Sequence, residues 1–274
     1  MEDCLRKKPK IGKTGEDVDE NNYIIQQFQE YQKELDFRHD KHERLVKLSR
    51  DVTIESKRVI FLMQRNSGSD KNNEKLEQAW KKIRDIQQQK FLPMAKELHG
   101  EDPYQFLRAY SAGLQEYIEA VAFYHYLKSK TLVSLDQVQA DLNFIVPSSD
   151  TENSQEKTIS VHVPPSEYIL GLADLTGELM RFAINSVGSG DLDTPNNVSA
   201  YLRNMLGGFE SVGQVSREMN RKVSTLRQSL RKVEAACYTL QIRGSEIPKE
   251  MLKDVFRSAP VGEMSYLDER DIDD

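Results

Sequence analysis

The longest stretch of this sequence without a helix-breaking residue sets the first constraint on its fold. Between Glu16 and Ser67 there is neither glycine nor proline. Apolar residues recur through this stretch at the spacing of one helix face: Ile24, Phe28, Leu35, Leu45, Val52, Val59 and Met63. The pattern predicts one long helix over roughly residues 22–65. Because so long a helix gains most of its stability by packing its apolar stripe on other helices, an all-α bundle is expected.

Glycines, prolines and capping residues divide the rest of the chain into further helices. The second helix is expected from about Asn73 to Leu98, with a bend at Pro93 and a cap at Gly100, and the third from Asp102-Pro103 to about Lys128. A Ser134/Gln137 capping box predicts a short helix through Phe144, and a longer one is expected from Pro165 to before Gly188. The remaining helices are expected from Thr194-Pro195 to an interruption at Gly207-Gly208 and Gly213, over roughly 215–242, and near Lys249–Phe256. The first two helices are expected to form an antiparallel hairpin. The result is an all-α bundle of about six to seven helices, several of them long.

The two ends and one internal insertion differ in composition from the helical part. The expected basic tail covers residues 1–20, with a net charge of +3 in residues 1–15, and the expected acidic tail covers residues 259–274; both are typical of disordered segments. A polar insertion at about 147–158 precedes alternating Ile159, Val161 and Val163, which predict a brief strand-like arm. The expected organisation is one helical domain over residues 21–258 between the two tails.

Composition narrows the class of protein. The net charge of −6 argues against a basic surface spread over the whole protein for nucleic acid. No apolar run approaches the roughly 20 residues of a membrane-spanning helix, so no membrane association is expected. The two cysteines give neither a disulfide framework nor a zinc-ligand spacing. These features are typical of an intracellular protein.

Two pairs of acidic residues carry the candidate chemistry. Glu116 and Glu119 are three residues apart in GLQEYIEA, and therefore project from one face of their expected helix. Asp174 and Glu178 are four apart in a largely apolar helix and share a face in the same way. If the two helices pack together, four carboxylates meet, and they cannot all stay ionised without a neutralising cation.

An oxygen-only ligand set favours Mg²⁺, or Mn²⁺, over zinc or copper. Such a site, with one ion or two, could activate water and hold a scissile phosphate. A second interpretation stays open, in which the acids of the later helix are simply its solvated side. In that case they belong to one polar stripe: Glu167, Asp174, Glu178, Arg181 and Asn185.

Several stretches, taken together and in this order, resemble the translin-associated factor X family over roughly residues 31–256. They are RHDKHERLVKLSRD at 38–51, GLQEYIEA at 113–120, DLTGELMR at 174–181, NSVGSGDLDTP at 185–195, KVEAACYTL at 232–240 and RGSEIP at 243–248. The resemblance implies a translin-like fold that co-assembles with translin into a closed hetero-oligomeric shell. The family's catalytic acids fall on Glu116, Glu119 and Asp174, with Glu178 as a less certain fourth.

The resemblance also implies an activity. The chain is expected to be the catalytic subunit of a Mg²⁺-dependent endoribonuclease that acts on single- or double-stranded small RNA, including passenger-strand removal during activation of the RNA-induced silencing complex, with DNA as a possible further ligand. Residues 6–10, RKKPK, match a nuclear import signal as well as a solvated basic tail. The expected location is therefore the cytoplasm with nuclear access.

Two other classes of function remain open from the sequence. One is a non-enzymatic helical scaffold, and the other is a non-catalytic subunit that binds RNA or DNA beside translin. Basic residues for phosphate contact occur at Arg38, Lys41, Arg44, Lys47 and Arg50. Acids alternate with them, however, which is equally the pattern of a salt-bridged solvated face.

Overall fold

The computed structural model describes residues 23–65, 72–147, 156–187, 191, 193–213 and 216–243. The expected tails, the basic residues 6–10 and the expected helix near Lys249–Phe256 lie outside these ranges. By its internal contacts the chain divides after Lys41 into two units, each of which is described by itself. Among the described helices, none is both long and apolar enough to cross a bilayer.

The long first helix is confirmed as α1, Tyr23–Gln64. In its first part, which belongs to the N-terminal unit, large apolar side chains such as Phe28 and Leu35 are more than half exposed. In its second part, the side chains at the predicted core positions are completely buried: Leu45, Val52, Val59 and Met63. Only this second part of the stripe therefore contributes to the core of the larger unit.

The second expected helix is one helical run of three parts, α2 (Asn72–Ile86), the π-helical turn η1 (Gln87–Phe91) and α3 (Leu92–Leu98). The irregularity predicted at Pro93 is this π turn, in which the Leu92 amide donates to Gln87 O. Proline lacks an amide hydrogen and crowds the carbonyl four residues earlier, so a local change of helix type relieves the clash. Gly100 follows with φ +83°, a left-handed conformation that favours glycine.

Polar contacts set this run antiparallel to α1, as predicted. Arg44 pairs with Glu97, Asp51 with Lys90, and the Arg65 carbonyl accepts from Lys75. Residue numbers rise along α1 as those of its partners fall. The two helical runs are therefore antiparallel over the part of α1 from Arg44 onward.

Two helix boundaries differ from the expectation. Asp102 does cap the backbone through the Tyr104 amide, but residues 103–106 form turns and α4 begins only at Leu107, ending at Ser129. The Ser134/Gln137 capping box is present, yet α5 ends at Asp141 (Leu135–Asp141). Phe144 is instead in strand β1, Asn143–Pro147, where its buried side chain faces Ile159 across an antiparallel pair. A β-branched and aromatic segment gains more from this pairing than from a further helical turn.

The expected arm is confirmed only in part, as strand β2, Glu156–Ser160, paired to β1: Ile159 lies in the strand, Val161 and Val163 follow its end, and residues 156–158 of the expected insertion belong to it. The last described helices are α6 (Pro165–Val187), α7 (Asp193–Val212) and α8 (Arg217–Arg243). The interruption expected at Gly207-Gly208 is wrong, because α7 continues through both residues. The break comes at Gly213, with φ +75°.

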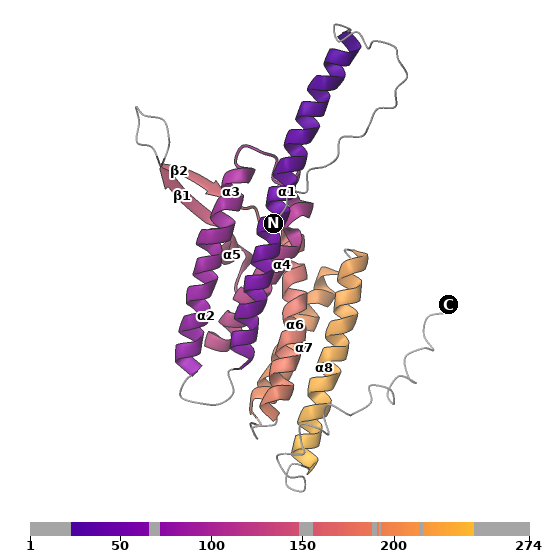
Figure 1. Cartoon of the computed structure of the whole chain (residues 1–274). Coiled ribbons are helices and arrows are strands. Elements are labelled where there is room, and N and C mark those ends of the chain that lie inside the picture. Colours follow the sequence, from indigo (N-terminus) through magenta and orange to yellow (C-terminus); the bar gives the residue numbers. More distant parts are fainter. Residues whose placement is uncertain are drawn as a thin grey trace, which may run out of the picture. The chain divides into compact units, whose positions relative to one another are not determined.

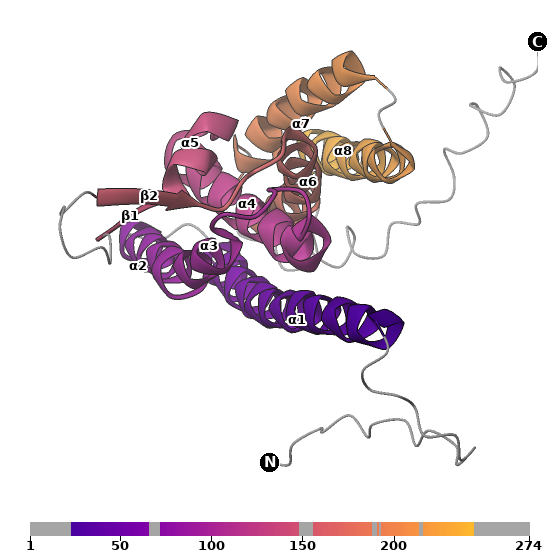
Figure 2. The same ribbon diagram turned by 90° about the horizontal axis from the view of Figure 1, so that it is seen from above.

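The all-α class is confirmed, with seven helical rods in the described residues when α2, η1 and α3 count as one, plus a two-stranded ribbon. Within the larger unit α4 packs on α2 on one side and on α6 on the other, and α7 and α8 cover α6 (Figure 1). The view along the bundle in Figure 2 shows α4 between these two groups. The helices of the two acid pairs, α4 and α6, are therefore central neighbours.

Candidate functional site

A glycine brings the two acid-bearing helices unusually close. A Cβ atom at Gly171 of α6 would lie 2.9 Å from Gln115 O and from the Ile118 side chain, both on α4. Only a residue without a side chain permits this approach. The contact lies within one turn of both Glu119 and Asp174, so it fixes the separation of the two acid pairs.

Glu119 lies at the centre of the predicted acid cluster. Its residue is only 8% exposed, and the charges of Glu116, Asp174 and Glu178 all act on it. Burial, and after it these three neighbouring charges, raise the pKa of Glu119 to about 8. None of the other described residues donates a hydrogen bond to its carboxylate or forms an ion pair with it. The fold therefore brings together the four acids named from the sequence.

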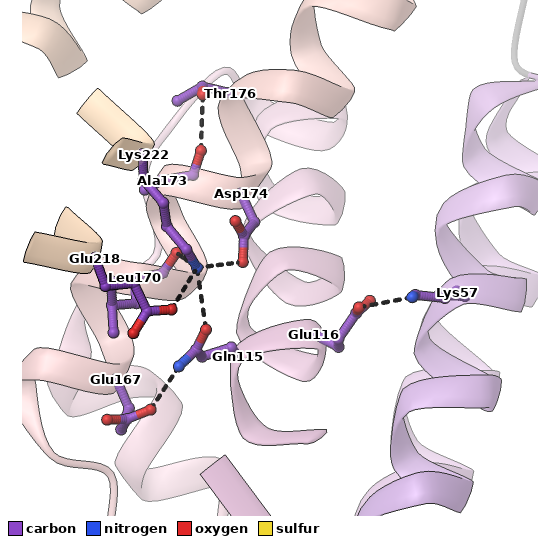
Figure 3. Close-up of polar contacts among 10 residues, drawn as sticks. All are labelled: Lys57, Gln115, Glu116, Glu167, Leu170, Ala173, Asp174, Thr176, Glu218 and Lys222. Atoms are coloured by element: carbon purple, nitrogen blue, oxygen red, sulfur yellow. Dashed lines mark hydrogen bonds and ion pairs between the residues drawn. The ribbon is translucent and has the colours of Figure 1, made fainter. Parts of the chain in front are cut away.

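Two lysines from outside the acid helices engage two of these acids (Figure 3). Lys57 Nζ of α1 lies 2.9 Å from Glu116 Oε1, and its side chain is 63% exposed. Lys222 Nζ of α8 lies 2.8 Å from Asp174 Oδ2, and its side chain is only 14% exposed. Figure 3 shows Glu116 directed toward Lys57 and Asp174 toward Lys222.

Glu178 is held by a third residue from outside the pair of helices. Gln64 Nε2 of α1 donates to Glu178 Oε2 at 2.7 Å and to its carbonyl oxygen at 2.8 Å. Arg181 approaches the other carboxylate oxygen at a longer 3.4 Å from a largely exposed position. Since the Glu178 side chain is only 16% exposed, it is not part of a solvated stripe.

Sequence reasoning missed Lys57, Gln64 and Lys222. Lys222 could have been recognised from the sequence, because it occupies a position on the buried stripe of α8 that includes Met219, Leu226, Leu230 and Val233. A lysine at a core position needs an anionic partner, so this position could have been singled out. No comparable sequence pattern distinguishes Lys57 or Gln64.

The donor set fits a hard divalent cation by its chemistry. Glu119 is a nearly buried carboxylate that forms no ion pair with the described residues, although the charge of Lys57 acts on it, and Gln64 Oε1 beside Glu178 is a buried oxygen that accepts no hydrogen bond from the described residues. As the side chains lie, however, the described residues contain no group of three His, Cys, Asp or Glu close enough to hold an ion. Glu116 and Asp174 are instead paired with Lys57 and Lys222.

The basic stretch in α1 is largely paired. Arg38 pairs with Glu34 in the N-terminal unit, and in the larger unit Lys47 pairs with Glu43 and Arg44 with Glu97. These contacts agree with a salt-bridged solvated face.

Comparison by sequence finds similarity over most of the chain. A model of the translin family matches residues 40–244. The chain is 49% identical to translin-associated protein X of Pongo abelii, over 88% of this chain and 87% of that protein. It is 30% identical to the translin-associated protein X homolog of Schizosaccharomyces pombe, over 76% and 84% of the two chains. With translin of Bos taurus it shares 30% identity over 53% of this chain and 59% of that one.

Comparison by structure finds the same fold in more distant proteins. AfC3PO in complex with duplex RNA superposes with a TM-score of 0.61, covering 81% of this chain and all of that one at 17% identity. Apo-NeC3PO superposes with a TM-score of 0.58, covering 78% and 94% at 20% identity. At these identities the likeness concerns the fold alone.

Proposed function

The chain belongs to the translin family, in its translin-associated protein X branch, and on this premise we propose that it is the catalytic subunit of a Mg²⁺-dependent endoribonuclease assembled with translin. One observation carries the proposal: Glu119 is buried among three other carboxylates, and the described residues form neither an ion pair nor a hydrogen bond with its carboxylate. Carboxylates gathered in this way repel one another, and a bound cation offsets that repulsion.

Glu116, Glu119 and Asp174, with Glu178 as a fourth, are the residues proposed to hold Mg²⁺, or Mn²⁺ in its place. The bound ion would supply Lewis-acid polarisation of the scissile phosphate and a water of lowered pKa. Glu119 would contribute its carboxylate from a buried position on α4, and Gln64 holds the carboxylate of Glu178 through a hydrogen bond to Oε2. Lys57, exposed at the edge, is placed to meet a phosphate when it leaves Glu116.

The proposed substrate is a small RNA, single- or double-stranded, with DNA as a further possible ligand. Support comes from the fold shared with AfC3PO, which was solved with duplex RNA. The proposed partner is translin, in a closed hetero-oligomeric shell, and the name of the relatives supports this partner. The proposed biological role is passenger-strand removal during activation of the RNA-induced silencing complex. The proposed location is the cytoplasm with nuclear access.

The decisive experiment measures RNA cleavage by the complex with translin, with and without Mg²⁺. Glu119→Ala and Asp174→Ala should each lower the rate by about 100-fold or more, because the ion stabilises charge that develops only in the transition state. Glu97→Ala is the matched control, since that acid lies on α3 and pairs with Arg44. Near-normal cleavage by both site variants would overturn the proposal.

A non-enzymatic scaffold is the second candidate function. It is favoured by one observation, that Glu116, Asp174 and Glu178 each already have a polar partner. A scaffold predicts that Glu119→Ala leaves thermal stabilisation by Mg²⁺ unchanged, whereas the proposed enzyme loses that stabilisation.

A further inference from the structure

Tyr104 and His162 form an aromatic pair at the surface of the larger unit. Tyr104 is 61% exposed. The two rings meet edge to face, with centroids 5.4 Å apart and an angle of 75° between their planes, and His162 Nε2 lies 3.4 Å from the Tyr104 hydroxyl oxygen. A ring left so open to water contributes little to the hydrophobic core.

The backbone beneath both rings is held by hydrogen bonds. The Tyr104 amide donates to Asp102 Oδ1 at 2.7 Å. On either side of His162, the amides of Val161 and Val163 donate at 3.1 Å and 2.9 Å to a backbone carbonyl and to a glutamine oxygen. The pair is therefore pre-organised, which lowers the entropy cost of binding a flat ligand against it.

A cation follows this pair closely in the chain. Arg108 is exposed four residues after Tyr104, and the bond from the Leu107 amide to the Tyr104 carbonyl closes the turn between them. The Arg108 guanidinium forms neither an ion pair nor a hydrogen bond with the described residues. It lies in the first turn of α4, where the helix dipole disfavours a positive charge. Its charge therefore does not stabilise the helix and is open to a phosphate.

The two acid-bearing helices run in the same direction. The contact of Gly171 with Gln115 is followed, further along both helices, by an edge-to-face contact of Phe182 with Phe123. Residue numbers thus rise together along α4 and α6, so both helices begin at the same end of the bundle.

The aromatic pair lies at that end, at a similar distance from both acid pairs. Tyr104 comes three residues before the start of α4 and His162 three residues before the start of α6. Glu116 and Asp174 each lie nine residues into their helix, about 14 Å along its axis. A strand bound at the acids can therefore reach the aromatic pair within a few nucleotides.

The surroundings of Tyr104 favour a nucleobase over an apolar protein surface. Among the described residues between Phe61 and Leu132, Tyr104 is the only large apolar side chain that is exposed. Protein partners bind patches that gather several such side chains. A base, by contrast, stacks on a single aromatic ring, and its phosphate pairs with arginine.

We propose that Tyr104, with His162 at its edge, stacks one base of the RNA substrate and that Arg108 binds an adjacent phosphate. The stacked base lies about four to six nucleotides from the cleaved bond, because 14 Å or somewhat more is spanned at roughly 3.4 Å per nucleotide. This inference rests on the proposed function, since it assigns where the same substrate is held outside the acid cluster.

The first test measures RNA binding by the full-length chain assembled with translin, in the presence of a chelator that prevents cleavage. The probe is a single-stranded RNA labelled with fluorescein at one end. Tyr104→Ala should weaken binding at least about fivefold, because one base loses its stacking partner. Tyr104→Phe keeps the ring and should stay within about twofold of the unmodified affinity.

The salt dependence of binding separates stacking from charge. Arg108→Met should lower the slope of log affinity against log salt concentration by about 0.7, the value for one phosphate of a single strand. Tyr104→Ala should leave this slope unchanged. Tyr238→Ala is the matched control, because Tyr238 is 66% exposed on α8, and it should change neither the affinity nor the slope.

A second measurement depends on no variant. RNA carrying 5-iodouridine at successive positions is irradiated in the unmodified complex, and the adducts are mapped by mass spectrometry. The expected adduct joins Tyr104 or His162 to a nucleotide about four to six residues from the cleaved bond.

The outcomes separate this inference from the proposed function. Unchanged binding by Tyr104→Ala, or adducts only on other residues, would overturn the stacking site while leaving the nuclease intact. RNA that is bound at Tyr104 but never cleaved with Mg²⁺ would remove the nuclease and support the stacking site. No RNA binding by the unmodified complex would overturn both. If Tyr104→Ala fails to assemble, the adducts of the unmodified complex decide.

Discussion

Lys57 Nζ of α1 and Glu116 Oε1 of α4 form an ion pair of 2.9 Å at the exposed edge of the acid cluster. The hydrogen bond to Glu116 and the charge of that carboxylate raise the pKa of Lys57. The lysine remains 63% exposed, however, so water screens the pair. This pair can open at little free-energy cost, unlike the contact between Asp174 and Lys222, whose side chain is only 14% exposed.

Replacing these two lysines should therefore have unequal effects on stability. Lys57→Met is expected to change the free energy of unfolding by less than about 1 kcal/mol. Lys222→Met should lower it by about 1–3 kcal/mol, because three part-buried acceptors lose their donor. Urea denaturation of the metal-free protein measures both, and equal losses would contradict the distinction.

The raised pKa of Glu119 predicts how the stability of the metal-free protein depends on pH. The carboxyl titrates near 4.5 in the unfolded chain and near 8 in the folded one. Between these values the folded state binds a proton that the unfolded state has released, so stability falls as pH rises from about 4.5 to 8. Glu119→Gln should remove this fall and be the more stable protein at pH 8, by on the order of 2 kcal/mol.

Unfolding in urea at pH 5 and at pH 8, in the presence of a chelator, tests this expectation. Glu97→Gln serves as control, because that carboxylate lies outside the cluster. If the unmodified chain and Glu119→Gln lose stability in parallel between the two pH values, Glu119 is not the group responsible.

The sequence was sufficient for most helices because local rules decide them. The glycine- and proline-free stretch predicted α1 to within a residue or two, and Ser134 with Gln137 marked the start of α5. The end of α5 was missed because β1 forms only through pairing with β2, on the far side of the insertion. The start of α4 was missed because Asp102 caps a turn that does not continue as helix.

The sequence predicted only part of the candidate site, because the site also depends on contacts between helices that are distant in sequence. The helical spacing of the acids placed each pair on one face, but nothing local states that α4 and α6 touch. That contact depends on Gly171, whose role appears only when Gln115 and Ile118 are seen against it. The residues that engage the acids come from α1 and α8, far away in sequence, so they follow from tertiary packing rather than from any motif.

Two glycines of α6 offer a matched test of how close α4 and α6 must be. Gly171→Ala should destabilise the protein by about 1–3 kcal/mol and weaken cleavage, because the new methyl group overlaps α4. Gly177→Ala has open space around it and should be neutral or stabilising by about 0.5–1 kcal/mol. Thermal melting and cleavage assays compare the two, and an equally harmless Gly171→Ala would show that the helices can separate without loss.

The last prediction concerns the hold of Gln64 on Glu178. Gln64→Met keeps the length of the side chain but removes both hydrogen bonds, so it should lower stability by about 1–2 kcal/mol. Arg181→Met should change it by less than about 0.5 kcal/mol, since Arg181 is 64% exposed and its contact is longer.

A double-mutant cycle with Glu178→Ala separates the pairwise energy from other losses. If Gln64 acts through Glu178, the coupling between them should be on the order of 1 kcal/mol, and cleavage by Gln64→Met should resemble that of Glu178→Ala. With Gln64 gone, Glu178 can turn toward Arg181 and leave the cluster, so both variants remove the same carboxylate from the site. Additive effects on stability, with full cleavage in Gln64→Met, would mean that Glu178 keeps its position without the glutamine.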